Sequence, residues 1–123
     1  MFRILVTEDV DPAGLELLRR ECTVSVVLTQ DRDEVRRLIT DADAIVVKGS
    51  TQLPAEVLCC APRLKAIGRV GNGLDNIDVG YASAHQIAVF NTPEGATRAV
   101  AELTVLQMLA LCRRAYEAHR AWL

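Results

Sequence analysis

The sequence is poor in the residues that build metal centres and acid–base pairs. It has two histidines and four cysteines in 123 residues, and no Cys-x-x-Cys pair. Metal-ligand spacings are therefore missing, and we expect no bound metal. His85 and His119 have no acidic partner at a spacing that would favour general acid–base catalysis. Adjacent Cys59 and Cys60 would form a disulfide only with strain, so we interpret all four cysteines as reduced thiols in or near the core.

The sequence also lacks an excess of basic charge and any long apolar run. Its formal net charge is −2, which gives no broad basic surface, so nucleic acid is not an expected partner. No apolar run reaches the ~18 residues that a membrane span needs, and we expect none. Acidic residues between positions 8 and 11 interrupt any signal-peptide pattern. With 50% apolar and 24% charged residues, the chain is expected to be soluble and globular, and reduced cysteines would suit a cytoplasmic protein.

What the sequence does contain is a regular alternation of short apolar runs and helix-start signals. Asp11 stands before Pro12, and Asp31 stands three residues before Glu34, as is typical of helix N-termini. Further helices are expected from Pro54 and after Asp78, and the expected strands are 2–6, 23–28, 44–47, 65–70 and 87–90. Alternation with short links indicates parallel strands joined by crossovers. The sequence therefore predicts an α/β fold, a flavodoxin-like, doubly wound, five-stranded parallel sheet with helices on both faces and a fully buried third strand.

The last segment has a different pattern. Between residues 99 and 112 only Glu102, Thr104 and Gln107 are polar, which predicts a helix that is apolar nearly all round. Such a helix needs cover from a second domain or from a second copy of the chain. We therefore expect one domain over residues 1–95 and a linker helix over residues 96–123.

Ligands of such sheets bind beyond the carboxyl ends of the strands, where three loops are expected. Residues 91–93 are expected to form a turn before the last helix, and the other two loops carry the residues best suited to bind a ligand. Residues 48–51 supply a cation, a glycine and two hydroxyls, all of which suit an anionic oxygen. Residues 68–73 supply three glycines, whose backbone N–H groups are accessible, and the charge of Arg69. Plain glycine turns are the alternative for both loops. Asp75, Asn76 and Asp78 are expected to brace the loop and cap a helix.

The second loop and the segment after the fifth strand resemble a known family. Gly68-Arg69-Val70-Gly71-Asn72-Gly73-Leu74-Asp75-Asn76-Ile77-Asp78, then Asn91-Thr92-Pro93 and Ala101-Glu102, are similar to motifs of the D-isomer-specific 2-hydroxyacid dehydrogenases. The resemblance implies the substrate-binding domain of an NAD-dependent enzyme that acts on a small anionic 2-hydroxy or 2-oxo acid. Carried over by position, the implied substrate-binding residues are Lys48, Gly49, Ser50, Arg69, Gly71, Asn72 and Gly73.

The resemblance also implies what this chain lacks. The family carries its dinucleotide fingerprint and its catalytic Arg, Glu and His on a second domain, and those segments are not found here. The glycines at 68, 71 and 73 have the wrong order for the fingerprint. We therefore expect this chain alone to catalyse no oxidation, and neither the particular acid nor a preference between NAD and NADP follows from it.

Two alternatives remain open at this point. One is a stand-alone binding module that forms a dimer through the helix at 99–112. The other is a phosphoacceptor receiver domain, which Glu8 and Asp9 after the first strand would suit. Receivers carry an aspartate after the third strand, where this chain has Lys48, and this disfavours the second alternative.

Overall fold

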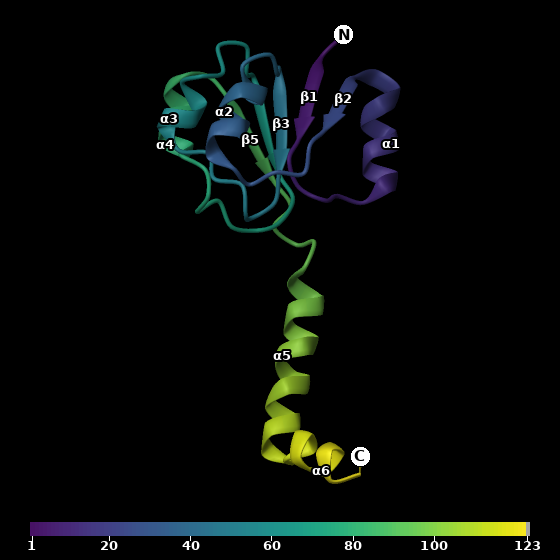
Figure 1. The fold of residues 1–123 in the computed structure, drawn as a ribbon. Coiled ribbons are helices and arrows are strands. Elements are labelled where there is room, and N and C mark those ends of the chain that lie inside the picture. The colour runs from purple at the N-terminus through teal and green to yellow at the C-terminus, as the bar shows by residue number, and fades with distance from the viewer. Residues whose placement is uncertain (123) are drawn as a thin grey trace. The chain divides into compact units, whose positions relative to one another are not determined.

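The computed structural model describes residues 1–122, and the chain forms two compact units, Met1–Thr92 and Pro93–Leu123. Figure 1 shows the strands of the first unit and the two helices of the second. The strands are β1 (Arg3–Val6), β2 (Thr23–Val26), β3 (Ala44–Val47), β4 (Ala66–Arg69) and β5 (Ala88–Asn91). The helices are α1 (Pro12–Glu21), α2 (Arg32–Ile39), α3 (Ala55–Leu58), α4 (Val79–Ala84), α5 (Thr97–Cys112) and α6 (Ala115–Trp122).

All five strands are parallel and lie in the order β2-β1-β3-β4-β5. This confirms the predicted α/β sheet, in which the chain starts near the middle, moves to one edge and then crosses to the other. The strand β2 ends two residues earlier than expected, at Val26, and Leu28 is exposed beyond it. The reversal of direction between β1 and β3 brings the ends of these two strands side by side.

The hydrophobic core lies on the face of the sheet that α2, α3 and α4 cover (Figure 1). Ile45 and Val47 from β3 and Ile67 from β4 are completely buried there, together with Ile39 of α2 and Val57 of α3. Burying such a side chain contributes about 1.5–3 kcal/mol. The period of two in β3 sends alternate side chains to this face, so this core holds the sheet to its three helices.

On the other face α1 packs against β2, so that helices stand on both faces of the sheet (Figure 1). The expectation that β3 is buried on both sides was wrong, because Ala44 and Val46 are only half-buried. On this face Phe90 of β5 is 63% exposed, since no helix of the first unit covers it. A sizeable part of this face therefore remains apolar and uncovered within the first unit.

The helix α1 begins as predicted but buries less than its sequence suggests. Asp11 caps it by accepting a hydrogen bond from the Ala13 N–H at 2.8 Å, and Pro12 is the first helical residue. No residue of α1 is fully buried, and Leu17 is 60% exposed. The helix packs mainly against the edge strand β2, so its apolar side enters no second layer of core.

The start of α2 confirms half of the predicted capping box. The Asp31 carboxylate accepts a hydrogen bond from the Glu34 N–H at 2.8 Å. The return bond is absent, because the Glu34 carboxylate accepts from the Thr29 hydroxyl at 2.6 Å instead, and the Asp31 N–H donates to that hydroxyl. Thr29 thus replaces one arm of the box, so Asp31 makes the side-chain cap of this helix.

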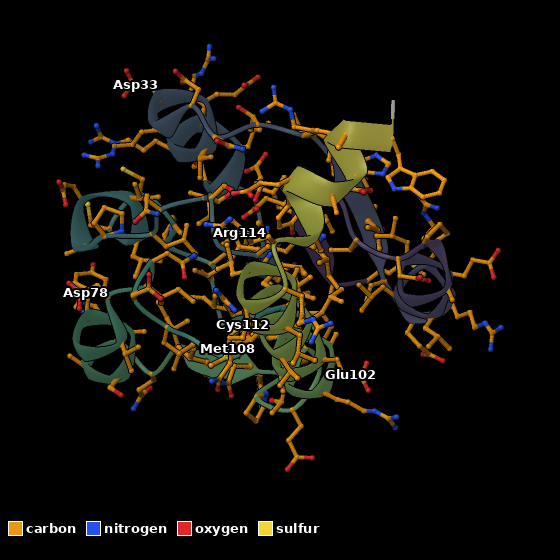
Figure 2. All side chains as sticks on the ribbon, turned by 90° about the horizontal axis from the view of Figure 1, so that it is seen from below. Asp33, Asp78, Glu102, Met108, Cys112 and Arg114 are labelled. Carbon is orange, nitrogen blue, oxygen red and sulfur yellow. The ribbon has the colours of Figure 1, made fainter. Side chains whose placement is uncertain are left out.

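Substituting this cap should measurably weaken the first unit. We expect Asp31→Ala to lower the free energy of unfolding by about 1 kcal/mol, the usual effect of removing an N-cap side chain. Asp33→Ala is the matched control, because Asp33 projects outward in the same first turn (Figure 2) and makes only a 3.7 Å ion pair with Arg36. Both variants lose one acidic charge near the helix N-terminus. Urea denaturation measures the free energy of unfolding of both variants. Equal decreases would mean that the Asp31 cap does not stabilise the first unit.

The second unit consists of α5 and α6, and neither helix has a buried residue. Arg114 lies between them with a φ of 50°, a left-handed conformation that ends α5 (Figure 2). Glu102 is exposed and paired with Arg98 at 2.7 Å. Within residues 1–122, no helix has the length and apolar character required to cross a membrane.

The interpretation of all four cysteines as core or near-core thiols was wrong for two of them. Cys22 and Cys60 are half-buried, whereas Cys59 and Cys112 are exposed. Cys59 lies just past the end of the short helix α3, and Cys112 closes α5, whose side chains have no core to enter. The apolar character of a cysteine is too weak a signal to place it without the fold.

Candidate functional site

The carboxyl ends of β1, β3 and β4 lie at one edge of the sheet, and each is followed by a polar loop. Glu8 follows β1, residues 48–51 follow β3, and residues 70–78 follow β4. In open parallel sheets this edge is where ligands bind. These loops therefore form the candidate site, and its parts are described in turn.

The centre of the site is the guanidinium group of Arg69, which lies against the backbone of three glycines. A Cβ atom at Gly49 would stand 3.4 Å from Arg69 Nη2, and one at Gly73 would stand 4.0 Å from the same nitrogen. A Cβ atom at Gly71 would overlap Arg69 Nη1. Gly71 also has a φ of 138°, which favours glycine. The absence of side chains at these positions makes room for the guanidinium.

Arg69 has no partner for its charge within the part of the chain that the structure describes. Its Nε atom is buried without a hydrogen-bond acceptor. None of the ion pairs among residues 1–122 involves it. Leaving a buried donor unpaired costs about 1–3 kcal/mol, and more for a charged group. An anion at this position would supply the missing acceptor.

The glycine loop is held in place by the end of β5. The Gly71 N–H donates to the Thr92 hydroxyl at 2.7 Å, and the Thr92 N–H donates back to the Gly71 carbonyl at 3.0 Å. The Asn91 side-chain amide donates to the Asn72 carbonyl at 2.8 Å. The sequence predicted only a turn at residues 91–93 and gave no sign of these contacts. The predicted residue Asn72 thus contributes its carbonyl to the structure of the loop.

The loop of residues 48–51 is held from two sides. The Glu8 carboxylate accepts hydrogen bonds from the N–H groups of Lys48 at 2.8 Å, Ser50 at 3.2 Å and Thr51 at 3.0 Å. From the other side, the Asn76 side-chain amide donates to the carbonyls of Lys48 at 3.1 Å and Thr51 at 2.8 Å. Three amides of this loop, which was predicted to bind an anion, therefore already hold one, a carboxylate of the chain itself.

This arrangement keeps Glu8 ionised. Partial burial alone would raise the pKa of the Glu8 carboxyl group, but the hydrogen bonds from Thr51, Lys48 and Ser50 outweigh that effect and hold the pKa below its ordinary value. Sequence reasoning missed this residue. The available signal was its position, an acidic residue directly after β1 at the same edge as the other two loops.

The structure brings together only four of the seven predicted substrate-binding residues. Gly49, Arg69, Gly71 and Gly73 are gathered around the guanidinium. The side chain of Lys48 instead lines a hollow of ≈410 Å³ at the ends of β1, β2 and β3, with Glu8 and Asp9 on its wall. The polar contacts of Ser50 and Asn72 are made by backbone atoms.

Asn76 and Asp78 have the bracing and capping roles that the sequence predicted, whereas Asp75 makes no hydrogen bond or ion pair among the described residues. Asn76 is buried and clamps the neighbouring loop, as described above. The Asp78 carboxylate accepts from the Tyr81 N–H at 2.8 Å and caps α4. Asp75 is exposed, with Oδ1 2.7 Å from the place of a Cβ atom at Gly73. Within residues 1–122, no group of acidic, histidine and cysteine side chains is arranged to hold a metal ion.

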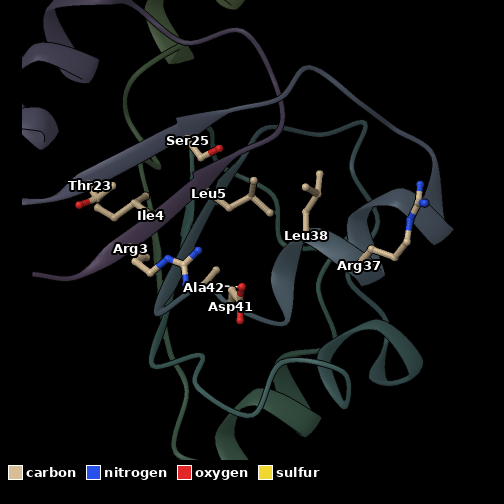
Figure 3. Close-up of a pocket in the computed structure, with 9 residues that line it drawn as sticks. All are labelled: Arg3, Ile4, Leu5, Thr23, Ser25, Arg37, Leu38, Asp41 and Ala42. Carbon is tan, nitrogen blue, oxygen red and sulfur yellow. Dashed lines mark ion pairs between the residues drawn. The ribbon is translucent and has the colours of Figure 1, made fainter.

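A cavity of ≈240 Å³ lies away from this site, between α2 and the strands β1 and β2 (Figure 3). Its wall includes Arg3 and Asp41, which form an ion pair at 3.5 Å, and the side chain of Arg37. Arg3 stands at the start of β1, Asp41 just beyond the end of α2 and Arg37 in the last turn of α2, at the opposite edge of the sheet. The cavity therefore contributes nothing to the site around Arg69.

Comparison with known proteins gives consistent matches along nearly the whole chain. The model of the D-isomer specific 2-hydroxyacid dehydrogenase catalytic domain matches residues 4–121. A D-3-phosphoglycerate dehydrogenase from a Synechocystis species is 34% identical over 121 residues, or 98% of the chain. The solved structure of a protein from Thermus thermophilus is 32% identical, with a TM-score of 0.89 over 94% of the chain. An NAD+-bound 3-phosphoglycerate dehydrogenase from Entamoeba histolytica is 26% identical, with a TM-score of 0.77 over 89% of the chain.

All of these relatives are much longer than the part that matches. The chain spans 22% of the Synechocystis protein and 38% of each of the two solved chains. The similarity therefore concerns one part of a larger architecture, and that part contains both the glycine loop and the Arg69 position.

Proposed function

The chain belongs to the D-isomer specific 2-hydroxyacid dehydrogenase family, and we propose that it is the substrate-binding part of such an enzyme. Members of this family act on 2-hydroxy and 2-oxo acids and bind NAD. In this proposal a small anionic acid binds at the corner formed by Arg69 and the backbone of Gly49, Gly71 and Gly73. Lys48 and Ser50 lie in the adjacent loop, and Asn72 shapes the glycine loop.

The observation that carries the proposal is the unpaired guanidinium of Arg69. A cation with a buried donor and no acceptor among the described residues is well suited to a carboxylate or phosphate oxygen. The glycines beside it leave room for such a group to approach the backbone closely. Its position beyond the carboxyl end of β4 is the usual location for a ligand in this fold.

The proposed ligand class is a small acid with two negative groups, such as 3-phosphoglycerate. The relatives named above as phosphoglycerate dehydrogenases support this choice. Lys48, in the adjacent loop, provides a second cation within the same edge of the sheet. Hydroxypyruvate or another small 2-oxo acid with a single carboxylate is the alternative within the same class.

Hydride transfer is assigned to a cofactor domain that these residues do not supply. The glycine loop does not fit a dinucleotide, because the Gly71 N–H is taken by Thr92 and α4 begins only at Val79. In a dinucleotide fold the glycine turn leads directly into a helix whose N-terminus holds the pyrophosphate. We propose that residues 1–95 form the substrate domain, and that residues 96–123 are a linker toward the cofactor domain. Alone, the chain is then inactive.

The exposed apolar side of α5 supports a second candidate, a stand-alone module that forms a dimer. Leu106 and Leu109 are both about three-fifths exposed, and with Val105 they border an apolar hollow on the helix surface. Such a surface needs a cover, which is either a cofactor domain or a second copy of α5. The solution mass of the purified chain separates the candidates, because only the dimerising module would form a stable pair by itself.

Titration of three variants with 3-phosphoglycerate tests the proposed site. We expect Arg69→Ala to weaken binding about 10- to 100-fold, the usual effect of losing charged hydrogen bonds. Asp75→Ala should change it less than about 3-fold, since Asp75 is exposed and acidic. Arg37→Ala, on the wall of the distant cavity, removes the same charge as a control. If calorimetry shows that Arg69→Ala and Asp75→Ala lose the same affinity for 3-phosphoglycerate, the assignment of this site is wrong.

A further inference from the structure

The contact between Glu8 and the loop of residues 48–51 is more than a local turn. The partners are separated by 40 to 43 residues along the chain, and both carboxylate oxygens are used. Oε1 accepts from Lys48 and Thr51, and Oε2 accepts from Ser50. Of the four amides in this loop, only the Gly49 N–H has no acceptor among the residues that the structure describes.

Other hydrogen bonds support the contact between Glu8 and residues 48–51. The hydroxyl groups of Thr7 and Thr51 are 2.9 Å apart and buried, which joins the end of β1 to the end of the loop. Asn76 holds the carbonyls of Lys48 and Thr51 from the opposite side. Three amides and two carbonyls of the loop are thus bonded to other loops, and in this arrangement Gly49 lies against Arg69 Nη2.

A charged Glu8 also limits where a ligand anion binds. The lowered pKa of Glu8 means that it carries a negative charge at neutral pH. A ligand carboxylate is therefore repelled from the amides of Lys48, Ser50 and Thr51 by the charge that they already hold. Within this loop the Gly49 N–H stays available, and it lies beside the Arg69 guanidinium.

We infer that Glu8 is a positioning residue of the substrate site. Its carboxylate acts as an internal anion that orders residues 48–51, so that the free Gly49 amide and Arg69 together receive the acid group of the ligand. This inference rests on the proposed function of the Arg69 site. It differs from the sequence-based expectation, which assigned the anion to the cation, the glycine and the hydroxyls of residues 48–51 and gave Glu8 no part in this site.

The variant Glu8→Gln separates positioning from simple electrostatics. The amide oxygen of glutamine still accepts from Lys48 and Thr51, but its NH₂ group faces the Ser50 N–H, a donor against a donor. The substitution also removes a negative charge near the ligand. If Glu8 acted only through its charge, this loss would strengthen the binding of an anion. If Glu8 positions the loop, binding becomes weaker even though a negative charge has been removed.

We expect Glu8→Gln to weaken 3-phosphoglycerate binding about 3- to 10-fold, as is usual for one lost hydrogen bond in the site. Asp9→Asn is the matched control, because it removes the same charge one residue later and its side chain makes no hydrogen bond in the described structure. Its affinity should be unchanged or slightly higher. Unchanged or tighter binding by Glu8→Gln would overturn the inference, as would equal weakening by both variants.

A second measurement protects the test against a merely unfolded variant. Glu8→Ala vacates the space between the three amides, so sodium formate should fill it and shift the backbone resonances of Lys48, Ser50 and Thr51 saturably. The wild-type chain should show no such shift at these amides. A folded Glu8→Ala whose loop resonances ignore formate would overturn the inference.

The two proposals fail in different ways. If the wild-type chain binds 3-phosphoglycerate and Arg69→Ala weakens it, but Glu8→Gln does not, only the positioning role is wrong. If the wild-type chain does not bind 3-phosphoglycerate, the proposed function is wrong. The role of Glu8 in positioning a substrate is then wrong as well. Formate binding by Glu8→Ala would then report only on the structure of the loop.

Discussion

Gly71→Ala is expected to reduce 3-phosphoglycerate binding about as strongly as Arg69→Ala, which is about 10- to 100-fold. The new methyl group would occupy the place of Arg69 Nη1. A guanidinium at the end of a flexible side chain swings away from such a clash, so Arg69 would leave the corner that it shares with Gly49 and Gly73. The site would lose its cation without losing the arginine from the sequence.

The same substitution should also lower the free energy of unfolding by about 1–3 kcal/mol, because alanine does not readily adopt the backbone conformation of Gly71. The φ of 138° lies in a region that side chains avoid. Gly14→Ala is the control. Gly14 lies in α1 with nothing near the place of its Cβ atom, so the variant should bind normally and gain about 0.5–1 kcal/mol of stability. Normal ligand affinity in a folded Gly71→Ala would show that the observed place of Arg69 is not the one used in binding.

Asn76→Ala is expected to have the largest effect on stability among the polar substitutions, about 2–4 kcal/mol. Asn76 is 3% exposed, and its amide donates to the carbonyls of Lys48 and Thr51. Removing it breaks both hydrogen bonds and leaves the two carbonyls with one partner fewer in a buried place. Asn72→Ala is the matched control, because that side chain is exposed and only its carbonyl is bonded. Urea denaturation at neutral pH compares the two.

The variant Asn76→Asp gives this prediction a pH dependence with a definite sign. It places a carboxylate where an amide had faced two carbonyl oxygens, and burial raises the pKa of such a group in the folded state. A group whose pKa is raised on folding stabilises the fold as the pH decreases. The free energy of unfolding that Asn76→Asp loses relative to wild type should therefore become smaller as the pH falls from 7 to 5. The loss caused by Asn76→Ala should stay nearly constant over the same range. If the stability losses of both variants changed with pH in the same way, the proposed role of the buried Asn76 amide would be wrong.

These predictions share one structural idea, which is that the site is held by hydrogen bonds between loops rather than within them. Residues 48–51 are positioned by Glu8 and Asn76. The glycine loop is positioned by Asn91 and Thr92. The residues that would touch a ligand therefore depend on others that follow different strands. Substitutions at these supporting positions should change affinity without touching the ligand.

The sequence by itself determined the parts of this protein that depend on neighbours a few residues apart. The caps at Asp11, Asp31 and Asp78 were predicted from spacing, because an N-cap bonds to an amide only two or three residues away. The alternation of apolar runs predicted the parallel sheet. The motif from residue 68 to 78 indicated the family, and the matches along residues 4–121 confirm it.

Only the tertiary structure decided how the site is assembled. Glu8 reaches the amides of residues 48–51 because β1 lies beside β3, and Thr92 reaches Gly71 because β5 lies beside β4. The order of strands is set by crossovers that leave no periodic pattern in the sequence. Exposure was decided in the same way, since Leu17 and Cys59 look apolar in sequence but have little packed against them. Local hydrogen-bonding patterns are visible in a sequence, whereas contacts across 20 or 40 residues appear only when the sheet is built.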